Sequence, residues 1–189
     1  MFDLIKNNEL LCENCRKLFK SRFIHFEVDG YKALAIYDYD ETIKTYLYQF
    51  KGCYDYELYP IFLNHYAFEL KIKYLGYILV PAPSYIKDDE KRGFKHVIEM
   101  FKILGLPILE VFEKTDPFKQ AENSAKKRKD IVKILKVKEN IILQGKKVLI
   151  IDDVFTTGAT VRGMIHHLKK LHPKDIKILV MSKTTLKPI

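Results

Sequence analysis

Short apolar runs alternate with amphipathic segments along the chain, and this alternation limits the possible folds more than any other feature. The spacing of apolar side chains predicts helices around residues 43–50, 56–70, 94–101 and 161–168. Apolar runs bounded by polar or turn residues predict strands over residues 31–39, 77–80, 106–112, 147–151 and 176–181. Strands that alternate with helices form a parallel sheet with helices on its faces. We therefore expect an α/β protein in which ligands bind beyond the carboxyl ends of the strands.

The composition fits one compact domain with a short leader. The chain has 189 residues, of which 48% are hydrophobic, so it can bury a substantial core. We divide it into a polar leader, residues 1–30, and an α/β domain, residues 31–189. No apolar stretch reaches the roughly 20 residues of a membrane-spanning helix, and the first residues do not resemble a secretory signal. With only three cysteines, these features predict a cytoplasmic protein without a transmembrane segment.

The chain carries a formal net charge of +9, from 33 Lys and Arg against 24 Asp and Glu. A surplus of this size favours anionic partners such as nucleotides, phosphates or nucleic acid. Lysine-rich faces also serve solubility alone, so the charge by itself leaves both interpretations open.

The segment VLIIDDVFTTGAT, residues 148–160, places two adjacent acids after a buried strand. We expect Asp152 and Asp153 to lie just past the carboxyl end of that strand, where a turn can bring both toward one ligand. Neighbouring carboxylates repel each other, and hydroxyl donors or a divalent cation relieve the repulsion. The pair therefore predicts a site for sugar hydroxyls or a metal ion.

Small residues follow the acids and lead into the helix predicted around residues 161–168. They let the backbone approach a ligand, and the unpaired amides of a first helical turn form an anion site. The predicted phosphate-binding residues are Thr156, Thr157, Gly158, Ala159 and Thr160. The alternative is an ordinary turn in which Asp153 or a threonine caps the helix. Acids that can bind hydroxyls, next to an anion site, favour a protein that binds ribose 5-phosphate.

The string LIIDDVFTTGAT resembles the phosphoribosyl-pyrophosphate (PRPP) motif of type I phosphoribosyltransferases. The resemblance implies a parallel sheet flanked by helices, with a small hood region. It also implies that Asp152 and Asp153 bind the ribose hydroxyls, directly or through Mg²⁺, and that residues 156–160 hold the 5-phosphate.

The order of segments from about Tyr31 onward resembles the ComF/ComFC group of competence-associated proteins. The matching segments are AIYDYDETIKTYLYQFKGCYDYELYPIF, LVPAPSYIKDDEKRGF, KQAENSAKKRKDI and the PRPP motif. The resemblance implies a PRPP-binding protein that assists uptake of transforming single-stranded DNA, with a helicase-like uptake protein as partner. In ComF relatives Asn-Gln usually follows Arg-Gly-Phe, whereas Lys95 and His96 stand there in this chain. We interpret His96 as a residue of the helix surface without a catalytic role.

Two further segments carry candidate phosphate ligands. The turn Pro81-Ala82-Pro83-Ser84 follows a predicted strand, as a pyrophosphate-binding loop does in the wider family. The diphosphate candidates are Pro83, Ser84, Lys87 and Arg92, and the alternative is a stiff turn with solvated charges. A long polar segment, residues 113–130, resembles the family's flexible loop. Its basic end, Lys126, Lys127, Arg128 and Lys129, could meet pyrophosphate or DNA, or form a solvated face.

Cys12 and Cys15 have the spacing of half a zinc site. ComF relatives commonly carry two such pairs in an N-terminal zinc finger, but the second pair is missing here. Cys53 is distant in sequence, and His25 is only a conceivable fourth ligand, whereas structural zinc normally has four ligands. We expect a degenerate zinc finger without metal.

Two other functions remain open beside the competence role. A nucleobase salvage phosphoribosyltransferase would use the same acids and Mg²⁺, but it needs a pocket for the base. The region after Met181 should supply part of that pocket, and SKTTLKPI offers no aromatic ring, which argues against salvage. A regulator in which PRPP only changes affinity for a partner is the third possibility.

Overall fold

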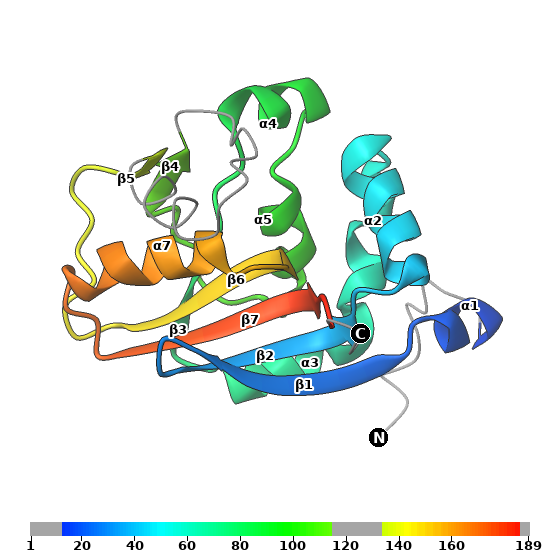
Figure 1. Ribbon diagram of the computed structural model, residues 1–189, viewed down its shortest axis with the longest axis horizontal. Helices are drawn as coiled ribbons and strands as arrows, with labels where there is room; N and C mark the ends of the chain where they lie inside the picture. Colours follow the sequence, from blue (N-terminus) through cyan, green and yellow to red (C-terminus); the bar gives the residue numbers. More distant parts are fainter. Residues whose placement is uncertain (1–12, 115–133, 186–189) are drawn as a thin grey trace, which may run out of the picture.

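The computed structural model describes residues 13–114 and 134–185. A five-stranded sheet forms the centre, in the order β1 (Ser21–Val28), β2 (Tyr31–Asp38), β7 (Asp175–Lys183), β6 (Lys147–Phe155) and β3 (Tyr77–Pro81) (Figure 1). The β1–β2 pair is antiparallel, and the other three pairs are parallel. The predicted α/β fold, with a mostly parallel sheet flanked by helices, is confirmed.

Helices cover both faces of the sheet, which explains why the central strands are apolar without alternation. Leu149 and Ile151 of β6 pack in one core with side chains of α2 (Glu41–Gly52), α3 (Ala67–Lys73) and α5 (His96–Phe101). Val148 and Ile150 pack in a second core on the opposite face, with the apolar stripe of α7 (Ala159–Lys169). Figure 1 shows α7 running along its face of the sheet. The alternate side chains of one strand thus join two separate cores.

The aromatic-rich segment does not form the single helix predicted over residues 56–70. It is broken into two short 3₁₀ helices, η1 (Tyr56–Phe62) and η2 (Asn64–Tyr66), before α3 begins. Pro60 lies inside η1, and a proline removes one backbone donor and clashes with the preceding turn of an α-helix. The aromatic side chains still pack in the core, as Phe62 is fully buried.

The strand predicted over residues 106–112 is also wrong. Ile108 makes only an isolated bridge with β3, in which Pro107 O accepts from Leu79 N–H and Leu109 N–H donates to Leu79 O. Pro107 has no amide hydrogen and cannot extend the ladder. The chain instead forms a short antiparallel pair, β4 (Phe112–Lys114) with β5 (Leu135–Val137).

The remaining described elements are three short helices. They are α1 (Glu13–Leu18), α4 (Ile86–Arg92) and η3 (Lys102–Leu104). Residues 21–28, which fall within the predicted leader, form the edge strand β1. Within residues 13–114 and 134–185, no helix is long and apolar enough to cross a membrane.

Candidate functional site

A pocket of about 800 Å³ opens at the carboxyl end of β6. It exists because neighbouring strands end at different heights: Pro81, the last residue of β3, pairs with Ile151, while β6 continues to Phe155 beside β7. Asp152 and Asp153 therefore emerge where one neighbouring strand has already stopped. The predicted position just past the strand is wrong, because both acids lie within β6. Both nevertheless line the pocket.

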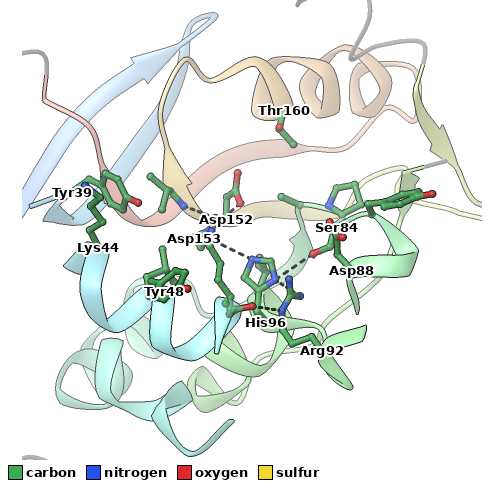
Figure 2. Close-up of a pocket in the computed structure, with 18 of the residues that line it drawn as sticks. Tyr39, Lys44, Tyr48, Ser84, Asp88, Arg92, His96, Asp152, Asp153 and Thr160 are labelled. Carbon is green, nitrogen blue, oxygen red and sulfur yellow. Dashed lines mark hydrogen bonds and ion pairs between the residues drawn. The ribbon is translucent and has the colours of Figure 1, made fainter. Parts of the chain in front are cut away.

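The two walls of the pocket come from distant parts of the sequence. Helix α2 forms one wall, and the loop after β3 together with α4 and α5 forms the other. Figure 2 shows Tyr39, Lys44 and Tyr48 on one side of the paired acids, and Ser84, Asp88 and Arg92 on the other. Thr160, from the first turn of α7, lies above the acids in this view.

Asp153 is the more buried of the two acids, with 7% of its surface exposed. Its Oδ2 accepts hydrogen bonds from Lys51 Nζ at 2.6 Å and His96 Nε2 at 3.1 Å. Its Oδ1 accepts from the Val154 N–H at 2.7 Å. Burial alone would raise the pKa of Asp153, but Lys51 and His96 outweigh burial and hold this pKa well below its ordinary value. Asp153 is therefore an ionised carboxylate, and both of its oxygens accept hydrogen bonds from the protein.

Asp152 is in a different state. Among the described residues its carboxylate has one hydrogen bond, in which Oδ1 accepts from the Asp153 N–H at 2.9 Å. Burial, and next the negative charge of Asp153, raise the pKa of Asp152 well above its ordinary value. Lys114 lines the same pocket, and burial lowers its pKa while the charge of Asp152 opposes that effect. The Asp152 carboxylate thus gains from any donor or cation that enters the pocket.

His96 is buried, with 8% exposure, so its interpretation as a helix-surface residue is wrong. Its Nδ1 lies 3.1 Å from Arg92 Nη1 and 3.3 Å from Ser84 Oγ. A guanidinium can only donate, so Nδ1 accepts and Nε2 carries the hydrogen that is donated to Asp153. The sequence signal for this role is that His96 follows the segment Arg92-Gly93-Phe94 with one residue, Lys95, between them.

Arg92 also joins the two walls. Its Nε donates to the backbone O of Lys51 at 3.1 Å, and its Nη1 donates to Asp89 Oδ1 at 2.9 Å. The Arg92 side chain is only 9% exposed, which is unusual for arginine and agrees with this set of partners.

The structure brings some of the predicted phosphate ligands together and leaves others outside. Pro83, Ser84, Arg92 and Thr160 line the pocket, whereas exposed Lys87 is not among its lining residues. The remaining motif residues form the turn before Thr160: Thr156 and Thr157 are exposed, Gly158 is buried and Ala159 begins α7. No side chain caps α7 at its N-cap, Gly158, so the capped-turn alternative for this segment is wrong.

Sequence reasoning missed the whole α2 wall. Tyr39, which precedes α2, and Lys44, Tyr48 and Lys51 of α2 line the pocket, although the apolar spacing of this helix predicted only packing against the core. No sequence signal connects Lys51 with Asp153, because the two residues are 102 positions apart.

Several predicted ligands cannot be placed. Cys12 and the basic residues Lys126, Lys127, Arg128 and Lys129 lie outside the described residues, and the side chain of Cys15 does too. Cys53 is exposed. Within the described part of the chain, no group of three or more His, Cys, Asp or Glu side chains could hold a metal ion by itself.

Comparison with known proteins agrees with this geometry. Residues 91–184 match the family model for the phosphoribosyl transferase domain. The chain is 28% identical to the competence protein ComFC of Streptococcus pneumoniae, over 88% of this chain and 72% of ComFC. It is 27% identical to the adenine phosphoribosyltransferase of Mycoplasmopsis pulmonis, over 67% of this chain and 74% of that enzyme.

Among solved structures, the purine phosphoribosyltransferase of Pyrococcus horikoshii matches with a TM-score of 0.42 and 21% identity, covering 67% of this chain and 78% of the other.

The segment that matches the family model, residues 91–184, contains the second half of the pocket, including Arg92, His96 and both acids. The chain therefore contains a phosphoribosyl transferase domain and is similar to ComFC-type competence proteins over most of its length.

Proposed function

We propose that the pocket binds PRPP or a related phosphoribosyl ligand. The observation that carries this proposal is the convergence of three kinds of group on one cavity of about 800 Å³. The pair of acids in β6 would provide the carboxylate contact to the ribose hydroxyls. The amides of the first turn of α7 and Thr160 would hold the 5-phosphate, since a helix N-terminus attracts anions. Ser84 and Arg92 would bind the diphosphate.

Magnesium fits this proposal at Asp152. Mg²⁺ in proteins is commonly held by one or two carboxylates together with substrate phosphates, so a cage of protein ligands is not required. The Asp152 carboxylate has one hydrogen bond among the described residues and can accept a cation. When bound, Mg²⁺ would neutralise charge on the diphosphate.

For the biological role, we propose a cytoplasmic competence protein that assists uptake of transforming single-stranded DNA, with a helicase-like uptake protein as partner. Similarity to ComFC over 88% of the chain supports this role. The net charge of +9 is compatible with a nucleic-acid partner. In this proposal the leader carries Cys12 and Cys15 as the remnant of a zinc finger, its residues 21–28 join the central sheet as β1, and Lys126 to Lys129 contact DNA or pyrophosphate.

One observation favours nucleobase salvage as a second candidate. The aromatic side chains that the segment after Met181 lacks are provided by the opposite wall, where Tyr39 and Tyr48 line the pocket. Tyr48 is 65% exposed, so its ring has a face available to a planar ligand. In that reaction a base nitrogen would form a bond to the ribose C1 while the bond from C1 to the pyrophosphate oxygen breaks. Similarity to an adenine phosphoribosyltransferase supports this candidate.

Calorimetric titration with PRPP, in the presence of Mg²⁺ and again with a chelator, tests the binding proposal. We expect clear binding with Mg²⁺ that the double variant Asp152→Asn, Asp153→Asn abolishes. Glu139→Gln is the matched control, because it removes an exposed carboxylate outside the pocket. Absence of PRPP binding by the unmodified chain would refute the proposal.

Two further assays separate the roles. Salt-sensitive binding of single-stranded DNA, together with lost transformation in a deletion strain, supports the competence role. Steady release of pyrophosphate with a nucleobase supports salvage. PRPP affinity with neither property leaves a PRPP-sensing regulator.

A further inference from the structure

We propose that the two acids have different tasks: Asp153 is an internal anchor that positions the pocket, and Asp152 is the carboxylate that meets the ligand. This inference rests on the proposed function for its ligand part. The family motif treats the acids as a pair, and only the contacts of each carboxylate distinguish them.

The first step is a count of hydrogen-bond donors. A carboxylate offers about four acceptor positions, and in Asp153 three are filled by protein groups: two on Oδ2 by Lys51 and His96, and one on Oδ1 by the Val154 N–H. A ribose hydroxyl that bound Asp153 at Oδ2 would have to displace an ammonium or an imidazole N–H, so among the described residues Asp153 keeps one acceptor position, on Oδ1, whereas Asp152 keeps three. A neutral hydroxyl cannot replace the charge of Lys51, so the exchange is unfavourable.

The second step is that Asp153 belongs to a closed ring of hydrogen bonds. Lys51 Nζ and His96 Nε2 both donate to Asp153, Arg92 Nη1 donates to His96 Nδ1, and Arg92 Nε donates to the backbone O of Lys51. The ring joins α2, β6, α5 and α4, and Figure 2 shows part of it at the floor of the pocket. It therefore sets the separation between the α2 wall and the wall that carries Ser84.

The third step is the state of Asp152. It lies on the same pocket floor, it has one hydrogen bond among the described residues, and its neighbours in the pocket include Thr160 and Lys114. A ligand hydroxyl or a ligand-bound Mg²⁺ can reach this carboxylate without breaking an ion pair. The sugar contact thus falls to Asp152, while Asp153, Lys51 and His96 act as positioning residues.

The test compares Asp152→Asn with Asp153→Asn in two measurements, affinity for ribose 5-phosphate with Mg²⁺ and thermal unfolding. We expect Asp152→Asn to lose about tenfold to a hundredfold in affinity with little change in the melting temperature, because only a ligand contact is lost. We expect Asp153→Asn to lower the melting temperature, because it leaves Lys51 without its counter-charge. Glu139→Gln again serves as the control.

The ring itself has a spectroscopic signature that does not depend on any ligand. The ¹⁵N NMR spectrum of His96 should show the Nε2–H tautomer, and Asp153→Asn should shift this signal while Asp152→Asn leaves the tautomer unchanged. If Asp153→Asn does not fold, His96→Gln and His96→Leu replace it. Gln keeps an N–H donor and should retain more ligand affinity than Leu, whereas a role in packing alone would favour Leu.

The inference is overturned if Asp153→Asn keeps the melting temperature yet loses as much affinity as Asp152→Asn, or if Asp152→Asn binds ribose 5-phosphate normally. If the unmodified chain binds neither PRPP nor ribose 5-phosphate, the proposed function fails and takes the ligand role of Asp152 with it. The ring is then judged on the melting temperatures and the NMR signal alone.

Discussion

Replacing Gly158 by alanine should destabilise the protein at the junction between β6 and α7. Gly158 has φ of +71°, a region that side chains other than glycine rarely adopt. A Cβ there would lie 2.3 Å from Phe155 Cζ and 2.6 Å from Phe155 Cε2, far inside contact distance. The Phe155 ring is itself buried and packs edge-on against Phe26 at 4.9 Å, so it cannot move freely.

The magnitude follows from these two causes. The left-handed backbone costs roughly 1–2 kcal/mol for a residue with a Cβ. Forcing the Phe155 ring to shift adds an overpacking cost of about 1–3 kcal/mol. We therefore expect Gly158→Ala to lower the free energy of unfolding by about 2–5 kcal/mol, measured by denaturant titration. Gly30→Ala is the matched control, because Gly30 has φ of +82° but no atom within 4 Å of the position that a Cβ would take, so it should show the backbone cost alone.

A double-mutant cycle separates the two causes. In a Phe155→Leu background the ring is absent, and the cost of Gly158→Ala should fall to that of Gly30→Ala. Because Gly158 precedes the first turn of α7, Gly158→Ala should also weaken binding of ribose 5-phosphate. The reasoning is refuted if Gly158→Ala and Gly30→Ala cost the same, or if Phe155→Leu does not reduce the cost of Gly158→Ala.

Three further predictions concern the pocket. Asp153→Asn should cost about 1–3 kcal/mol near neutral pH, less than a fully buried pair because the Lys51 side chain is 37% exposed. The folded-state pKa of Asp153 is lowered, so this contribution is present above the unfolded pKa of about 3.9 and is lost as the pH falls through the folded value. Denaturant titrations from pH 7 to pH 3 should therefore show the free energies of unfolding of the two proteins converging. A constant difference between them would contradict the assignment. Arg92→Lys should weaken pyrophosphate binding and lower the melting temperature, because lysine cannot reach both His96 and the Lys51 carbonyl. Calorimetry measures the first effect and thermal unfolding the second. Unchanged values would show that the guanidinium group is dispensable. Tyr48→Ala should weaken binding of a nucleobase or of single-stranded DNA by about 5- to 150-fold if the ring stacks on a base. A fluorescence titration measures this affinity, and equal affinities of the variant and the unmodified protein would contradict stacking.

Much of the fold was predictable because it depends on local patterns. The apolar run before Asp152 and the helical stripe that begins at Val161 predict a strand and a helix, and both elements form there, although the strand continues past the predicted end to Phe155. The errors have local physical causes as well. Pro60 breaks the expected helix into 3₁₀ turns, and Pro107 limits the expected strand to a single bridge.

The site was only partly predictable, because its contacts join residues that are far apart in the sequence. The motif around the two acids located the pocket floor, and the Pro81–Ser84 turn located one wall. Nothing near Lys51 in the sequence indicates that it pairs with Asp153, and the position of His96 shortly after Arg92-Gly93-Phe94 does not by itself indicate that the side chain is buried. The α2 wall was missed for the same reason, since its position depends on packing against the sheet.

The sequence by itself determined the α/β class and the strand that leads to Asp152 and Asp153, and it predicted the chemical type of ligand that such a segment favours. Those properties depend on the order of apolar and polar residues, which acts over a few positions. Only the tertiary structure decided that β6 extends past β3, that a ring of hydrogen bonds holds Asp153, and that Asp152 has a single hydrogen bond among the described residues. Two identical side chains acquire different states because Lys51 and His96, which come from distant parts of the sequence, donate to Asp153 and not to Asp152.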